Sequence, residues 1–369
     1  MNKYLRLVIK GTIILATLLL VGYAALVVYV SANKKFIINK FDSEIKSTVN
    51  GNVSYSDIKI NFFQNFPKVS VVIHKVMIAD SMFSQHQHPF FKSDKVVIQI
   101  GIPALFKKEL AISKVKISNG SFYLFTDSSG YSNSYLEQLK KPASQKNDAN
   151  KMQLESGTLE NVNFIVVNEK NKSNYDVYAK KLQLSFDVKD ESLNISTVAL
   201  LFIHGIAFYE PDGVFLKEKT LEGKFDFQYN KLLQEILADS ISVKIDGHPF
   251  KLSLQLALKK DAPEFDLKME TKNISYSSIK SLLSPKLSSA LSVVNLDSKI
   301  DAEARARSAA DGGKPLITAR WNVKNAKLTT PFFKFNKATF SASYSSEGDT
   351  NKIGNGTKRK IEITNFSTD

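Results

Sequence analysis

Few side chains in this sequence could catalyse a reaction or bind a metal. The chain has no cysteine, which excludes thiol nucleophiles, cysteine-ligated zinc, iron–sulfur clusters and disulfides. Its histidines are His74, His86, His88, His204 and His248. The segment His86-Gln87-His88-Pro89 offers two ligand nitrogens, but no third residue of a suitable type lies near it in the sequence. We therefore interpret the histidine pair as part of a polar loop and expect no metal.

The motifs of the common enzyme classes are also absent. The sequence contains no G-x-S-x-G, H-E-x-x-H, Walker or dinucleotide-binding glycine pattern. His204 ends an apolar run and precedes a glycine, which is more typical of a strand-end histidine than of a general base. Asp212-Gly213 and Asp246-Gly247 are typical of hairpin turns. We expect a protein that is not an enzyme and has no cofactor.

The positive charge of the chain does not indicate a nucleic-acid surface. Fifty Lys and Arg against 36 Asp and Glu give a formal net charge of +14. These basic residues are scattered as singles and pairs, and the densest cluster, Lys358-Arg359-Lys360, follows a stretch rich in Gly and Asn. We interpret them as a solvated surface, with attraction to anionic lipid headgroups as the next reading.

The elements that must position any site begin with an apolar segment. Residues 11–30 carry no charge, and a helix of that length spans roughly 30 Å, the thickness of a bilayer's hydrocarbon core. A signal-peptide core is usually about 7–15 residues long, although Val30-Ser31-Ala32 would suit cleavage. A buried core helix is the third reading. We expect an uncleaved anchor, with residues 1–10 as a cytoplasmic tail and the body translocated.

A helix and then a series of strands follow. Ile38, Phe41, Ile45 and Val49 have helical spacing, and Asn50-Gly51 then predicts the helix end. From residue 52 the period changes to two, which predicts antiparallel strands with one apolar and one wet face. The residues that we expect on the apolar face are Val71, Ile73, Val96, Ile98, Ile100, Val115, Ile117, Phe122, Leu124, Leu182, Leu184, Phe186, Phe225, Phe227, Leu252, Leu254 and Leu256.

Other segments depart from this alternation. The run VALLFI at 198–203 predicts a strand buried on both faces. Helical spacing predicts one or two turns at 134–141, a helix within 229–239 and another around Pro285 within 279–294. Because strands resume after the last two helices, we infer a weak internal repeat of strands and one helix, about fifty residues apart.

The domain boundary is predicted from composition. Residues 141–150, KPASQKNDAN, are polar and aperiodic, and we take them as a linker or loop between an N-terminal domain at 31–140 and a β body at 151–369. The final residues resemble a strand with no closing element, so we expect the chain to be part of a longer protein. The predicted fold class is mainly β with short helices (α+β): a transmembrane helix followed by an elongated, curved antiparallel sheet.

Two architectures would use the apolar strand faces. In a β-sandwich, two apolar faces close on each other. In an open groove, acyl chains replace the second sheet, and apolar burial at about 25 cal/mol per Å² would hold them. Periodicity alone leaves both open.

The first 135 residues resemble the N-terminal region of the AsmA family. The resemblance rests on a short basic start, one apolar span and a helix ending in Gly51, and on the order of the segments IKINFF at 58–63, NFPKVSV at 65–71, VMIAD at 76–80, ISNGSF at 117–122 and the turn at 127–133. The strand and helix series after residue 150 is similar to the family's repeating body, with less specificity.

The resemblance implies a single-pass protein of the inner membrane of a Gram-negative bacterium, with its body in the periplasm. Relatives of this family include TamB-like proteins and the bridge-like lipid transporters with a chorein N-terminus, which are taken to carry phospholipid along an apolar β-groove. We therefore expect phospholipid and the inner membrane as partners in envelope biogenesis. The alternative is a tethered assembly factor for outer-membrane proteins that carries no lipid.

Overall fold

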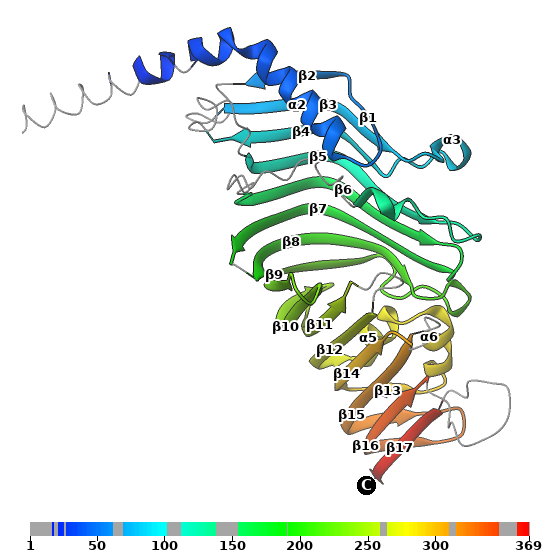
Figure 1. Cartoon of the computed structure of the whole chain (residues 1–369). Helices are drawn as coiled ribbons and strands as arrows, with labels where there is room; N and C mark the ends of the chain where they lie inside the picture. Colours follow the sequence, from blue (N-terminus) through cyan, green and yellow to red (C-terminus); the bar gives the residue numbers. More distant parts are fainter. Residues whose placement is uncertain are drawn as a thin grey trace, which may run out of the picture. The chain divides into compact units, whose positions relative to one another are not determined.

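The protein is described by a computed structural model at residues 17, 21–25, 27–61, 69–101, 112–137, 154–189, 191–258, 264–309, 315–346 and 360–368 (Figure 1). Seventeen strands in this part of the chain belong to one long sheet, with a few short helices. Each strand pairing whose register is described is antiparallel. The mainly β fold with short helices is therefore confirmed.

Two compact units divide the chain. The first comprises Met1–Ile117 and Tyr135–Leu154, and the second comprises Ser118–Ser134 and Glu155–Asp369. The second unit contains most of the strands. It also contains the two α-helices Tyr276–Leu282 and Pro285–Leu291. We describe each unit by itself.

The first unit begins with the predicted amphipathic helix. Helix α2 spans Lys34–Thr48, buries Ile37 and Phe41, and ends where the N–H of Val49 donates to the carbonyl of Ile45. The elements that follow are β1 Asn52–Ser54, β2 Asp57–Asn61, β3 Val69–Ala79, α3 Phe83–His86, β4 Phe91–Ile100 and the first part of β5 Ile112–Thr126. Strand β3 is central because β1, β2 and β4 all pair with it.

Half of the predicted anchor at 11–30 lies outside the described residues. Within the part that is described, no single helix has both the length and the apolarity needed to cross a membrane. The segments Val21–Ala32 and Lys34–Thr48 meet that test only when taken together, and they are bent by 64° at the break between them.

The second unit is a run of antiparallel strands in which most strands pair with the next one along the chain. Its strands after β5 are β6 Ser156–Asn168, β7 Ser173–Val188, β8 Ser192–Ala207, β9 Lys219–Asn230, β10 Glu235–Ile245, β11 His248–Ala257, β12 Glu264–Ser275, β13 Asn295–Asp297, β14 Lys299–Arg307, β15 Leu316–Thr329, β16 Lys334–Ser345 and β17 Lys360–Thr368. Helices α5 Tyr276–Leu282 and α6 Pro285–Leu291 follow β12, which pairs with β14. The helical segment predicted around Pro285 is confirmed, but it forms two helices rather than one.

One face of this sheet is apolar across many strands. Residues paired on neighbouring antiparallel strands face the same side. One such row runs from β6 to β17 through Leu159, Leu182, Ala199, Gly223, Val243, Phe250, Thr271, Ala302, Trp321, Ala342 and Ile363. The adjacent row on the other face includes Lys251, Glu270, Glu303 and Arg320. The sheet of this unit thus has one apolar and one charged face.

The helix predicted within 229–239 is wrong. Strand β9 ends at Asn230, and β10 begins at Glu235. The Asn230 side-chain oxygen accepts hydrogen bonds of 3.0 Å from the N–H groups of both Leu232 and Leu233, which turns the chain before a helix can form. The apolar spacing therefore arose from a turn followed by a strand, and the inferred repeat loses one of its two helices.

The strand at 198–203 is not buried on both faces. Val198 and Leu200 are 44% and 36% exposed, whereas Ala199 and Ile203 are buried. Across the sheet, Val198 pairs with Lys224 and Leu200 with Glu222, so the outer face carries charged neighbours that keep it solvated. The run VALLFI therefore forms a strand that is buried on one face and exposed on the other.

The turn predictions have different outcomes. Asp246 and Gly247, at φ 48° and 79°, form the two-residue hairpin turn between β10 and β11, as predicted. Asp212-Gly213 is not a hairpin turn, because Asp212 ends the 3₁₀ helix η2 Glu210–Asp212 inside the longer β8–β9 connection. At 134–141, the described part is the 3₁₀ helix η1 Asn133–Glu137, and 138–141 lies outside the described residues.

Candidate functional site: an apolar cavity

A cavity of about 680 Å³ lies within the second unit. This volume falls within the range of about 300–1,000 Å³ that is usual for small-molecule sites. Its floor is the apolar face of β11, β12, β14 and β15, and its roof is formed by α5, α6 and the β8–β9 connection, residues 208–218. Nearly all of the side chains that line it are apolar.

Alanines in the floor create the hollow. The register aligns Leu252, Met269, Ala304, Ala319 and Tyr344 in one row across β11, β12, β14, β15 and β16. Large side chains therefore stand at both ends of the row, and two methyl groups lie between them. Because a methyl group reaches only a short way above the sheet, the space over β14 and β15 stays open below the helices.

Helices α5 and α6 form one half of the roof. Ser275 caps α5 by accepting a 3.1 Å hydrogen bond from the N–H of Ser278. Tyr276 packs into the core beneath the helices, and its O–H donates to the carbonyl of Leu291 at 2.9 Å, which ties the start of α5 to the end of α6. Burial raises the pKa of Tyr276 to about 12, so the phenol stays a donor at neutral pH.

The β8–β9 connection forms the other half of the roof. The N–H of Leu216 donates to the carbonyl of Leu282 at 2.9 Å, which joins the connection to α5. Gly213, at φ +92°, approaches the α5–α6 junction so closely that an added Cβ would lie 3.1 Å from Cδ of Pro285. Phe208 stacks on Phe265 with 5.9 Å between ring centroids. The roof is therefore held to the floor and closed by contacts between its two halves.

Charged groups on these strands form ion pairs on the opposite face. Arg305 donates from Nε to Asp266 at 2.7 Å, and its guanidinium holds the pKa of that carboxyl below its usual value. Lys268 lies 3.5 Å from Glu303 on the same face. Because strand residues alternate between faces, these charged side chains pair with one another on the face opposite Ala302, Ala304 and Ala306, so Glu303 and Arg305 border the cavity without placing an ion pair inside it.

The sequence-predicted face residues lie in several places. Leu252 and Leu254 line the cavity. Phe225 packs against the buried hydrophobic cluster that includes Val243 and Phe250. Leu256 pairs with Phe265 on β12 and is not among the residues that line the cavity. The alanines of the floor did not enter the prediction, although the alternation of small residues at 302, 304 and 306 was a signal for a hollow in a strand face.

The predicted residues of the first unit are mostly buried. Val71, Ile73, Val96, Ile98 and Ile100 are each between 0% and 8% exposed. Val115 and Ile117 on β5 are half-buried. The strand face of β3 and β4 is thus a packed interior.

The remaining predicted residues lie on β5, β7 and β9 of the second unit and do not line the cavity. They are half-buried: Phe122, Leu124, Leu182, Leu184, Phe186 and Phe227. Phe122 stacks on Phe164 with 5.3 Å between ring centroids. Leu182 belongs to the row that continues into the cavity floor, so this part of the apolar face is continuous with it.

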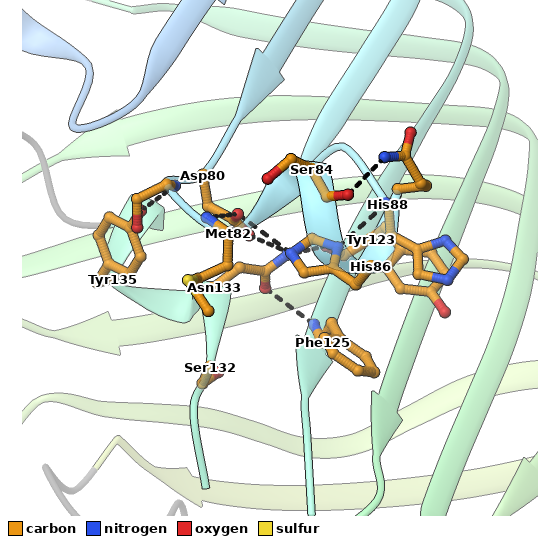
Figure 2. Close-up of polar contacts among 12 residues, drawn as sticks. Asp80, Met82, Ser84, His86, His88, Tyr123, Phe125, Ser132, Asn133 and Tyr135 are labelled. Carbon is orange, nitrogen blue, oxygen red and sulfur yellow. Dashed lines mark hydrogen bonds and ion pairs between the residues drawn. The ribbon is translucent and has the colours of Figure 1, made fainter. Parts of the chain in front are cut away.

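The histidine pair forms a local polar cluster in the first unit (Figure 2). The buried carboxylate of Asp80 accepts from the N–H of Met82 at 2.8 Å and lies 3.0 Å from Nε2 of His86. Nδ1 of His86 accepts from the N–H of His88 at 3.1 Å, which places the neutral ring's proton on Nε2. Among the described residues no group of three or more His, Cys, Asp or Glu could hold a metal ion. We interpret the cluster as a set of hydrogen bonds that stabilises the turn after β3.

Asn133, in the second unit, has a similar structural role. Its side-chain oxygen accepts from the N–H of Phe125 at 2.8 Å, and its nitrogen donates to the carbonyl of Tyr123 at 2.9 Å (Figure 2). The fully buried amide therefore completes the backbone hydrogen bonding of β5 where the chain turns back.

A comparison with protein-family models finds no match for this chain, and a comparison with curated proteins likewise finds none.

Proposed function

We propose that this chain binds and shields lipid acyl chains in the apolar cavity of its second unit, and that it transfers lipid without catalysing a reaction. The observation that carries the proposal is a cavity of about 680 Å³ with an almost wholly apolar lining, beneath a roof of two short helices and a loop. An apolar site of this size favours a ligand that gains free energy by leaving water and needs few polar contacts.

The dimensions of the floor support a single acyl chain. The strands β11, β12, β14, β15 and β16 are separated by four spacings of about 4.8 Å, so the row across them spans about 19 Å. An extended chain of single bonds advances by about 1.2 Å per bond, as an extended peptide does. The row is therefore about as long as an extended chain of 16 carbons, which would lie deepest over Ala304 and Ala319 and cross above the larger side chains at either end.

The energetics support retention of such a chain. Each buried methylene contributes about 0.8 kcal/mol, so a chain of this length gains about 12 kcal/mol before the costs of association are subtracted. Those costs are about 4–15 kcal/mol. The net free energy of binding therefore ranges from about 8 kcal/mol favourable to slightly unfavourable, so retention depends on how little order the cavity and the chain lose on binding.

The wider setting is also proposed. We propose that the chain is an AsmA-like protein held in the inner membrane of a Gram-negative bacterium by residues 11–30, with its body in the periplasm, where it serves envelope biogenesis. The resemblance of the N-terminal segments supports this setting. The apolar face of the second unit, along the row from Leu159 to Ile363, supports an apolar cargo, although most of the row is itself buried by packing.

A charge in the cavity floor tests the proposal. The full chain is purified from membranes, and its bound lipid is measured by native mass spectrometry and by transfer between vesicles. Leu254→Asp, in the floor, should abolish both, because a chain cannot lie beside a buried carboxylate. Gln255→Asp, its exposed neighbour on the other face, should change neither. Equal lipid binding and transfer by the two variants would refute the proposal.

A protein-binding scaffold is the second candidate, and one surface favours it. Ile361, Ile363 and Phe366 on β17 are 52%, 59% and 47% exposed, and within the described residues β17 pairs only with β16. An edge strand of this kind can add a strand from a partner. Photo-crosslinking from β17 and from the cavity separates the candidates, since protein adducts at β17 without lipid adducts in the cavity would favour the scaffold.

A further inference from the structure

The turn between β15 and β16 presents two adjacent aromatic side chains to solvent. Phe332 is 86% exposed and Phe333 is 64% exposed, and Phe332 is the most exposed large hydrophobic side chain in the described part of the chain. Neither residue lines the apolar cavity. Single apolar residues are ordinary on a protein surface, whereas two neighbouring phenyl rings at the end of a hairpin form a small apolar patch that needs a reason.

The turn holds these rings in place. The N–H of Thr330 donates to the carbonyl of Phe333 at 2.8 Å, and the Thr330 hydroxyl oxygen accepts from the N–H of Phe333 at 2.9 Å. Pro331 restricts the backbone at the first central position of the turn. The ring of Phe333 stacks on that of Phe335, with 6.2 Å between the centroids. The turn is therefore ordered before it meets a partner, which lowers the entropy cost of binding.

The hairpin that carries the rings is basic. Residues 312–346 contain no Asp or Glu, and Lys327 and Lys334 flank the turn. Lys334 pairs with Thr329, and Lys327 lies two residues before Thr329 on β15, so both lysines lie on one face of the hairpin. Asp297 on β13 pairs with Lys327 and is an acidic neighbour. Two lysines against one aspartate leave the charge beside the rings net positive.

We propose that the β15–β16 turn inserts Phe332 and Phe333 into the surface of an anionic lipid bilayer, with Lys327 and Lys334 against the lipid phosphates. Apolar and aromatic side chains enter the boundary between headgroups and acyl chains, and lysines near the surface are attracted to anionic lipid. The inference does not depend on the proposed function, because it uses a surface outside the cavity.

A protein partner fits this surface less well. Lysine is depleted in protein interfaces. Two phenyl rings bury about 300–500 Å² in total, less than the surface of about 800 Å² that each partner contributes to a stable protein interface. A bilayer needs no such area, because each ring gains free energy by leaving water on its own.

A fluorescent label in the turn tests the insertion. Because the chain has no cysteine, Pro331→Cys gives one site for an environment-sensitive nitrobenzoxadiazole label beside both rings. Asn171→Cys is the matched control, since the exposed turn at 169–172 in the same unit has two lysines and one glutamate but no aromatic residue. The full chain, held in a non-ionic amphipol, is mixed with vesicles of phosphatidylcholine alone or with phosphatidylglycerol, with and without nitroxide-labelled lipid.

We expect the label at position 331 to shift to the blue with anionic vesicles and to be quenched by the nitroxide lipid, and the label at position 171 to show neither change. Equal responses at the two positions, or no response at position 331, would overturn the proposal. Photo-crosslinking from position 331 in native membranes that gives protein adducts without lipid adducts would also overturn it and assign the turn to a protein partner.

Substitution of the rings tests their contribution. Phe332→Ala with Phe333→Ala should weaken binding to anionic vesicles, measured by co-flotation, about tenfold for each ring removed. Both rings are exposed, so thermal unfolding should be unchanged. Leu232→Ala with Leu233→Ala, which removes an exposed apolar pair from the β9–β10 turn, should leave vesicle binding unchanged. Wild-type binding by the phenylalanine variant, or an equal loss in the leucine variant, would refute the assignment.

Substitution of the lysines tests the choice of an anionic surface. Lys327→Gln with Lys334→Gln should weaken binding to phosphatidylglycerol-containing vesicles about fivefold for each lysine and leave binding to phosphatidylcholine vesicles unchanged. Equal binding of the wild-type chain to the two kinds of vesicle would contradict the selection of anionic lipid.

Discussion

Filling the hollow over the floor alanines should displace a bound acyl chain without harming the fold. Ala319 lies between Ala304 and Tyr344 in the row that crosses the cavity floor. Ala319→Phe adds six carbons to a position that faces the cavity, whereas Thr318→Phe adds an aromatic ring one residue away on the opposite face. The two variants therefore differ mainly in whether the ring enters the hollow.

The magnitude follows from the methylenes that the ring replaces. If the phenyl ring displaces about four methylenes from the floor, the chain loses about 3 kcal/mol of binding free energy at about 0.8 kcal/mol each. That loss weakens binding by about 200-fold. The ring fills existing space, so the melting temperature should stay the same or rise.

The assay is retention of a 16-carbon probe by the full chain, measured by native mass spectrometry and by displacement of a fluorescent alkyl reporter. Thermal unfolding of both variants serves as the control for folding. If Ala319→Phe folds normally and retains the probe as well as Thr318→Phe does, the hollow is not the acyl site and the reasoning from the alanine row is wrong.

Three further predictions concern two sets of hydrogen bonds and one ion pair that stabilise the fold. Asp80→Ala should lower the free energy of unfolding by about 2–4 kcal/mol in urea titrations, because two donors, from Met82 and His86, lose their buried acceptor. Tyr276→Phe should cost about 1 kcal/mol by the same measurement and should speed release of a bound chain, since its hydrogen bond ties α5 to α6. Asp266→Asn should destabilise the fold by about 0.5 kcal/mol at pH 7. Because Arg305 lowers the pKa of Asp266 in the folded state, this difference is present above the unfolded pKa and disappears as the pH falls through the folded pKa, below 3.8.

Each of these has a contradicting result. An unchanged urea midpoint in Asp80→Ala would show that the turn after β3 does not depend on this carboxylate. Release from Tyr276→Phe at the wild-type rate would mean that α5 and α6 do not open to admit ligand. A difference between Asp266→Asn and wild type that persists at pH 2 would exclude the ion pair as its source.

The sequence predicts the strand character and the apolar face well, because both follow from local alternation. Leu252 and Leu254 alternate with polar neighbours, and both line the cavity. The helices around Pro285 were also predictable, since Pro285 at the first position of α6 separates two helical patterns. After Asn230, the spacing of the apolar residues predicted a helix that does not form. There the Asn230 side chain accepts hydrogen bonds from two backbone N–H groups and turns the chain instead.

The cavity itself could not be predicted from periodicity. A hollow depends on which side chains are opposed across strands, and the register that aligns Ala304 with Ala319 joins residues on separate strands. The roof depends on contacts distant in sequence, such as that of Gly213 with Pro285. The burial of Val71 and Ile100 in the first unit is likewise set by tertiary packing, which an alternating pattern does not specify.

A high-resolution experimental structure of the full chain purified from its membrane tests the central claim most directly. The account predicts an extended, chain-like density of about 16 carbons in the apolar cavity, lying over Ala302, Ala304 and Ala319. A cavity that is filled by the protein's own side chains or by ordered water, in a preparation that also carries no lipid by mass spectrometry, would contradict it.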